Sequence, residues 1–138
     1  MNLILHALVI LAMVPFCVAS TSNAIMYRMY ITNGIEDNIE VHVFGKDQDY
    51  QGQRTLSFNE EFDYKIRVKV GTISRGEFWW GSKYAIVSIY NFNIFGVCFS
   101  GNIFEVQRCY WLVRPDGIYV NGNNDTFPNR GWHKKITW

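Results

Sequence analysis

Nine consecutive residues in the middle of the chain alternate between apolar and charged side chains, and this pattern constrains the fold more than any other. Phe62, Tyr64, Ile66, Val68 and Val70 occupy every second position, and an aspartate, two lysines and an arginine lie between them. Successive side chains of a β-strand point to opposite faces. The segment therefore predicts a strand with one buried face and one charged face in water.

Shorter segments of the same kind occur along the rest of the chain, separated by turn residues. The expected strands are residues 30–31, 39–44, 54–58, 62–70, 77–80, 83–90, 106–113, 118–120 and 132–138. The Asn33-Gly34 dipeptide predicts a hairpin turn between the first two, and residues 91–104 are expected to be irregular, with no helix. Short strands at regular spacing predict an all-β fold, a single-domain antiparallel β-sandwich over residues 25–138.

The N-terminal residues predict export. Residues 3–18 are almost wholly apolar, interrupted by His6 and Pro15, and small residues follow. This pattern is typical of a signal peptide, here residues 1–20, with cleavage between residues 19 and 24. A membrane anchor is the alternative, but the run is shorter than the roughly 20 residues that a span requires. We therefore expect a secreted, extracellular (apoplastic) domain that does not insert into a membrane.

Two cysteines, Cys98 and Cys109, follow the predicted signal peptide, which contains Cys17. Disulfides persist in exported proteins, so we expect a bridge between the two, worth on the order of 3 kcal/mol on the chain-entropy model. The alternative is that they lie on separate strands as free thiols. In the same region of the mature chain, Asn124-Asp125-Thr126 is an N-glycosylation sequon with Asn124 as the acceptor.

Charge and motifs give no indication of catalysis or of nucleic-acid binding. The chain has 13 Lys and Arg against 12 Asp and Glu, a formal net charge of +1, which does not favour a polyanion as partner. The acidic segment after Gly45 begins like a calcium loop, but Phe58 occupies the twelfth position, where a bidentate Glu is required. His42 has no second histidine at metal-binding spacing. We expect no catalytic residue, no metal and no cofactor.

Five motifs occur in a fixed order along residues 27–121. They comprise Ile31, Asn33 and Ile35; His42, Lys46, Asp47, Asp49, Tyr50 and Gly52; Leu56, Glu60, Phe62, Tyr64 and Ile66; Phe78, Trp80 and Tyr84; and Cys109, Trp111, Val113, Asp116 and Gly117. With these residues the chain resembles the plant self-incompatibility protein S1 family, a family of small secreted S-protein homologues. The last motif, C-x-W-x-h-x-x-D-G with h apolar, is the best single match.

The cysteines depart from the family pattern, which usually has four in two disulfides. Val43 stands at the first position, and Trp80 is matched to the second, within the family motif F-x-C-x-x-x-W. Glu105 stands near the third, while Cys98 lies further upstream. We therefore expect a divergent member in which packing alone holds the loop after Val43.

The resemblance implies a non-enzymatic ligand that a cell-surface receptor recognises, and the best-known members cause rejection of self-pollen. The loop with Lys46, Asp47, Gln48, Asp49 and Tyr50 is the predicted recognition loop, and the wider candidate surfaces are residues 45–53, 71–76 and 91–108. The alternative function is an apoplastic carbohydrate-binding or defence protein, in which exposed Trp79, Trp80 and Tyr84 stack on a glycan.

Overall fold

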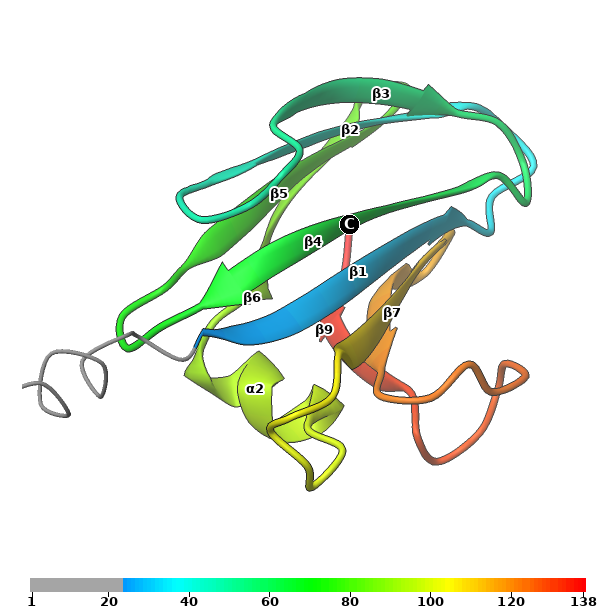
Figure 1. Cartoon of the computed structure of the whole chain (residues 1–138). Helices are drawn as coiled ribbons and strands as arrows, with labels where there is room; N and C mark the ends of the chain where they lie inside the picture. Colours follow the sequence, from blue (N-terminus) through cyan, green and yellow to red (C-terminus); the bar gives the residue numbers. More distant parts are fainter. Residues whose placement is uncertain (1–23) are drawn as a thin grey trace, which may run out of the picture.

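Two β-sheets and one short helix make up residues 24–138, which the computed structural model describes (Figure 1). The predicted signal peptide lies outside the described residues. The elements are β1 (Ile25–Asn33), β2 (Ile39–Gly45), β3 (Gly52–Leu56), β4 (Glu61–Val68), β5 (Ser74–Trp80), β6 (Lys83–Tyr90), α2 (Phe92–Cys98), β7 (Gln107–Arg114), β8 (Gly117–Asn121) and β9 (His133–Ile136).

The sheets have five and four strands, in the orders β4-β1-β7-β8-β9 and β3-β2-β5-β6. The expected two-sheet, all-β fold is confirmed. Neighbouring strands run antiparallel with one exception, β1 and β7, which are parallel, with Ile31 opposite Trp111. A parallel pair needs a long crossover connection, and here the four-stranded sheet and α2 provide it.

The alternation in β4 has the predicted consequence for burial. Phe62, Tyr64, Ile66 and Val68 are buried, and the residues between them are exposed. The prediction is wrong for Val70, which is fully exposed because β4 ends at Val68. Their apolar side chains join one core between the two sheets, in which the largest fully buried side chains include Trp111, Tyr27, Phe78 and Met29. The core fixes both sheets, and the strand ends then determine where the loops lie.

The predicted hairpin at Asn33-Gly34 is wrong, because β1 and β2 belong to different sheets. Asn33 is fully buried, and its side chain bonds three backbone groups. The amide donates to the carbonyls of Asp37 and Leu56 at 2.8 and 3.0 Å, and its oxygen accepts from Ile35 N–H at 2.8 Å. Asn33 therefore holds the crossover between the sheets instead of turning a two-residue hairpin.

The expectation of no helix is also wrong, since α2 lies within the segment expected to be irregular. The side chain of Asn91 accepts a hydrogen bond from Ile94 N–H at 3.0 Å and caps the helix, which is the usual role of asparagine at this position. Ile94 and Cys98, four residues apart, form its buried face. Because apolar residues occupy most positions of this short segment on both faces, the sequence shows no helical period.

Candidate recognition surface

Three connecting segments lie together at one end of the sandwich, where β2 and β4 end and β5 and β7 begin. The strand registers show this, because Ser74 is opposite Gly45, Ile25 opposite Val68 and Tyr27 opposite Gln107. We call this the loop end; it consists of residues 46–51, 69–73 and 92–106. Figure 1 shows the turn after β4, helix α2 and the entry of the chain into β1 on the same side of the molecule. The loop end contains residues from each of the three predicted recognition segments.

The first of these loops is attached to the edge of β4 by backbone hydrogen bonds. Asp49 N–H donates to Lys65 O at 2.9 Å, Arg67 N–H donates to Asp47 O at 2.7 Å, and the Asp49 carboxylate accepts from Lys65 N–H at 2.7 Å. A single β-bridge also joins Gln48 to Ile66. The loop thus leaves the four-stranded sheet and bonds to the edge strand of the five-stranded one.

Side chains of the same loop reinforce this attachment. Ser74 Oγ donates to Gln48 Oε1 at 2.6 Å, and Gln48 Nε2 donates to Tyr50 O at 2.6 Å. The Tyr50 ring packs edge-on against Phe62, with ring centroids 5.6 Å apart. The expectation that packing alone holds the loop is therefore wrong, because hydrogen bonds hold it as well.

Among the five predicted recognition-loop residues, the structure assigns internal contacts to Asp47, Gln48, Asp49 and Tyr50. Lys46 is exposed and borders a hollow of about 460 Å³ between this loop and residues 69–73. Lys69 borders the same hollow, and its Nζ lies 3.9 Å from Asp47 Oδ1. The exposed part of this loop therefore carries both signs of charge, with Lys46 unpaired among residues 24–138 and Asp47 paired with Lys69.

The loop end also carries the most exposed large apolar side chains of the described residues. Val70 is fully exposed, and Phe104, Phe92 and Ile73 are 90, 88 and 70% exposed. A hollow of about 470 Å³ lies between residues 69–73 and α2, and Val70, Ile73 and Phe92 are among the residues that line it. The alternating pattern wrongly places Val70 on a buried strand face, whereas β4 ends at Val68. Ile73 and Phe92 lie in segments expected to be loops, and no period in the sequence identifies them as exposed.

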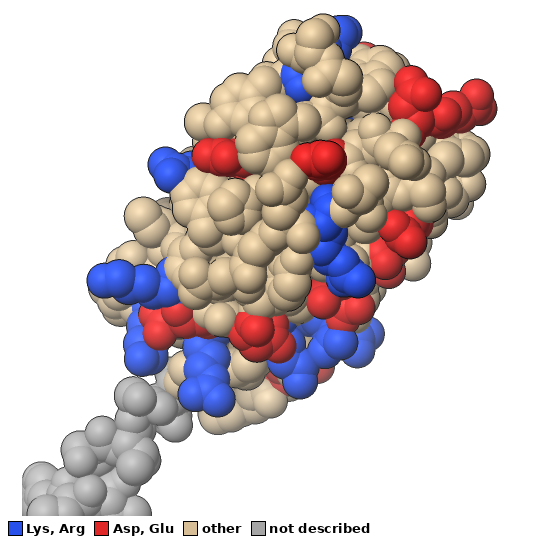
Figure 2. Space-filling model, turned by 90° about the horizontal axis from the view of Figure 1, so that it is seen from above, with Lys and Arg blue, Asp and Glu red and all other residues tan. Residues whose placement is uncertain are grey.

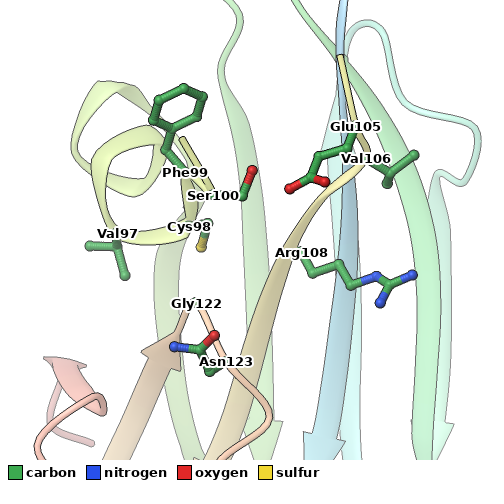
Figure 3. A pocket seen from close by; sticks show the side chains of 9 residues that line it. All are labelled: Val97, Cys98, Phe99, Ser100, Glu105, Val106, Arg108, Gly122 and Asn123. Atoms are coloured by element: carbon green, nitrogen blue, oxygen red, sulfur yellow. The ribbon is translucent and has the colours of Figure 1, made fainter. Parts of the chain in front are cut away.

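A third hollow, of about 480 Å³, lies beside α2 and the start of β7 (Figure 3). Figure 3 shows the Glu105 carboxylate directed toward α2, whereas the Arg108 side chain extends away from the helix. The disulfide between Cys98 and Cys109, with Cα atoms 5.3 Å apart, joins α2 to β7 at this place. The predicted bridge is thus present, and it fixes the helix to the five-stranded sheet.

The three aromatic residues proposed as a stacking platform lie at the opposite end of β5 and β6. Trp79 and Tyr84 are cross-strand partners with ring centroids 5.3 Å apart, and Tyr84 is 47% exposed. Trp80 instead makes internal contacts: its Nε1 donates to Asp37 Oδ2 at 3.2 Å, and its ring meets that of Trp138 edge-on. The structure therefore brings Trp79 and Tyr84 together, on a part of the surface away from the loop end.

The strand register corrects the position of one missing family cysteine. Val43 lies opposite Gly76, not opposite Trp80. If the motif F-x-C-x-x-x-W is placed with its tryptophan on Trp80, its cysteine falls on Gly76, which faces Val43 across the two strands. The position at 80 was assigned from sequence alone, and Gly76 is the position that a cross-strand bridge from 43 would require.

Electrostatics at the surface is mixed. Figure 2 shows lysine and arginine side chains interspersed with aspartate and glutamate over the face in view. The Tyr119 hydroxyl donates to Asp116 and, with Lys134 and Arg114 nearby, lowers the pKa of that carboxyl. Burial raises the pKa of the Tyr64 and Tyr27 hydroxyls, so both stay protonated at neutral pH.

Two other sequence candidates lie outside the loop end. His42 Nδ1 is 4.0 Å from Glu77 Oε2, and residues 24–138 contain no group of three or more His, Cys, Asp or Glu side chains arranged to hold a metal. The sequon residue Asn124 is exposed in the connection between β8 and β9.

Comparison with known proteins supports the resemblance found in the sequence. A family model described as plant self-incompatibility protein S1 matches residues 28–138. Searches of curated proteins and of solved structures found no significant match. Within the part of the chain that the structure describes, no helix has the length and apolar character to cross a membrane. The matched region covers nearly all of the described domain, and the chain belongs to the plant self-incompatibility protein S1 family.

Proposed function

We propose that this protein is a secreted, non-enzymatic ligand that a cell-surface receptor recognises through the loop end. Family membership supports the class of function, because the best-known S1 proteins act as such ligands in the rejection of self-pollen. The Cys98–Cys109 disulfide is consistent with export. The sandwich serves as a rigid support, and the loops determine which partner is bound.

The observation that carries this proposal is the distribution of exposed apolar side chains. Seven of the ten exposed large hydrophobic residues lie on the loop end, including the five most exposed. They are Val70, Ile73, Phe92, Phe99, Ile103, Phe104 and Val106. Fully burying one such side chain contributes about 1.5–3 kcal/mol, and clustered exposure of this kind marks interaction sites. Lys46 at its edge adds a charge that would orient a partner, whereas Lys69 is paired with Asp47.

The test uses the mature chain, residues 25–138, labelled and titrated onto intact plant cells or onto their extracted surface proteins. The variant V70S/F92S/F104S removes three exposed apolar side chains without touching the core. Because hot-spot residues each contribute 2 kcal/mol or more, we expect the affinity for the cell surface to fall by about 100-fold or more.

The matched control changes the three exposed hydrophobic residues that lie elsewhere, Phe58, Tyr84 and Ile86. The variant F58S/Y84S/I86S should bind as the wild type does, and both variants should keep the wild-type melting temperature. Equal affinity of the loop-end variant and the wild type would contradict the proposed surface. Absence of saturable binding to every tissue tested would contradict the ligand function itself.

Carbohydrate binding through Trp79 and Tyr84 is a second candidate, because these two rings contact each other and are partly exposed. The substitution Trp79→Ala should then abolish glycan-dependent quenching of tryptophan fluorescence and leave receptor binding unchanged.

We also propose that Asn124, exposed next to the partly buried Asp125 in the β8–β9 connection, carries an N-linked glycan. A mass shift removed by Asn124→Gln would test this.

A further inference from the structure

The outer face of the five-stranded sheet carries a row of three basic residues from three neighbouring strands. In the strand register, Arg28 of β1 lies opposite Lys65 of β4 on one side and opposite Arg108 of β7 on the other. The residues before and after each of them are buried, so all three side chains point to the outer face. Figure 3 shows Arg108 extending away from α2, in agreement with this direction.

This arrangement opposes the stability of the sheet. Like charges directly opposite each other on neighbouring strands are destabilising. Arg28 forms an ion pair with Asp63, but within residues 24–138 neither Lys65 nor Arg108 has an ion-pair partner. Arg67, one position further along the same face of β4, has none either among these residues. The row therefore holds more positive charge than the surrounding side chains neutralise.

The dimensions of the row suit an extended anion. Neighbouring strands lie about 4.8 Å apart, and positions i and i+2 of a strand lie about 7 Å apart. The basic side chains therefore present charges at repeated short intervals over roughly 10 Å of a sheet face. A chain molecule with a charge on each unit can meet several of them at once, whereas a single small anion cannot.

Aromatic side chains continue the same face in the next row. Tyr30 lies between Asp63 and Tyr110 in the register, and the rings of Tyr30 and Tyr110 are stacked, with centroids 4.8 Å apart. Beyond them, a small hollow of about 140 Å³ marks the limit of this face, because Glu61 and the sequon residue Asn124 line it together with Tyr110. Tyrosine and tryptophan offer an apolar ring together with a hydrogen-bonding group, which is the combination that sugar rings need.

From these features we propose that the outer face of the five-stranded sheet binds an acidic carbohydrate polymer, one whose sugar units carry carboxylates or sulfates. Lys65, Arg28 and Arg108 bind the anionic groups, and arginine matches such groups with two parallel hydrogen bonds. Tyr30 and Tyr110 contact the sugar rings. Asp63, two residues before Lys65 on the same face of β4, places a negative charge at one edge of the basic row. This site borders the loop end, since Arg108 lines the hollow beside α2, but it does not depend on the proposed receptor.

The test measures the affinity of the mature chain for polygalacturonate, which has carboxylates, for heparin, which has sulfates, and for uncharged dextran. We expect binding to at least one of the two acidic polymers and none to dextran.

The variant K65A/R108A should weaken binding of the acidic polymer by about tenfold, since two exposed charge-assisted contacts are lost. Asp63→Asn removes the negative neighbour and should strengthen binding several-fold. Tyr110→Leu removes an aromatic ring without changing the charge of the protein, and it should also weaken binding of the acidic polymer.

The matched control is R75A/K83A, which removes one arginine and one lysine from the four-stranded sheet and should leave polymer affinity unchanged. The loop-end variant V70S/F92S/F104S should also bind the polymer normally, so failure of the receptor proposal would not affect this result. The proposal is overturned if neither acidic polymer binds. It is also overturned if DNA or polyglutamate binds as tightly with the same dependence on Lys65 and Arg108, because the site would then recognise charge without sugar.

Discussion

At the scale of single residues, Asn33 shows how one polar side chain can determine the path of the chain. It belongs to the first family motif and is fully buried where β1 leaves the five-stranded sheet. Its amide bonds the backbone on both sides of the crossover, at Asp37 and at Leu56. Buried backbone groups without a hydrogen-bond partner lower the stability of the fold. The Asn33 amide makes three hydrogen bonds to such groups, two as donor and one as acceptor, and an apolar side chain could make none of them.

We predict that Asn33→Ala lowers the free energy of unfolding by about 2–4 kcal/mol, because it leaves buried backbone groups without partners. Urea unfolding followed by tryptophan fluorescence measures this change. The control Asn93→Ala removes an exposed asparagine side chain from α2 and should alter stability by less than about 0.5 kcal/mol. A loss below about 1 kcal/mol for Asn33→Ala would show that the three hydrogen bonds do not hold the crossover.

Sequence patterns predicted the strands well and the connections poorly, and Asn33 explains part of the difference. The alternation in β4 is visible in the sequence because every second residue is apolar where one face of the sheet is buried. The Asn-Gly dipeptide indicates only that the backbone can turn, and it does not show that the asparagine side chain is buried. The same limit applies to Asp47 and Asp49, whose role depends on the edge of β4, a strand distant from them in sequence.

At the scale of elements, α2 depends on the disulfide more than on its own sequence. A helix of seven residues with Gly96 inside it has little stability by itself. Ile94 and Cys98 face the core, and Cys98 is bonded to Cys109 of β7. The rings of Phe92, Phe95 and Phe99 stack in succession, and Phe95 also packs against the core. The bridge thus positions the most aromatic part of the loop end.

We predict that C98S/C109S lowers the free energy of unfolding by roughly 3 kcal/mol, the value that the chain-entropy model gives for a short closed loop. The sheets should keep their structure, while amide protons of α2 and residues 99–106 exchange faster. Hydrogen exchange with mass spectrometry, compared between this variant and the oxidised wild type, resolves the two regions. Uniform acceleration over both sheets would contradict a local role of the bridge.

At the scale of the whole molecule, packing replaces a disulfide in the four-stranded sheet. Val43 is fully buried opposite Gly76, where a Cβ atom would lie 2.8 Å from the Phe78 ring and 3.0 Å from Ile89. These side chains fill the space that a second residue at 76 would need. The divergence in cysteines therefore goes together with a tightly packed core at the same point, which sequence comparison alone could not show.

The net charge of +1 likewise hides an uneven distribution that only the strand register reveals. Lys65 and Arg108 lie 37 and 80 positions after Arg28 in the sequence. The three residues nevertheless form one row on neighbouring strands. The balanced total by itself does not favour a polyanionic partner. A total cannot describe a face, because binding depends on the local arrangement of charges.

The position of the N-terminus relative to the loop end leads to a last prediction. Ile25, the first residue of β1, lines the hollow next to Val70 and Phe92. Trp138 lies elsewhere: its ring contacts Trp80 at the far end of β5, and its Nε1 donates to Arg114 O at 2.8 Å. A bulky domain joined directly to Ile25 should therefore cover the proposed receptor-binding surface, and one joined to Trp138 should not.

Two fusions of the mature chain to the same fluorescent protein, one at each terminus, test this with titration onto plant cells. The N-terminal fusion should lose most of its cell-surface binding, and a flexible linker of about 20 residues, which spans roughly 25 Å on average, should restore it. Binding of both fusions to acidic polysaccharide should be equal, because that site lies on the sheet face. If the C-terminal fusion loses cell-surface binding instead, the receptor contacts the end of the sandwich that holds Trp80 and Trp138.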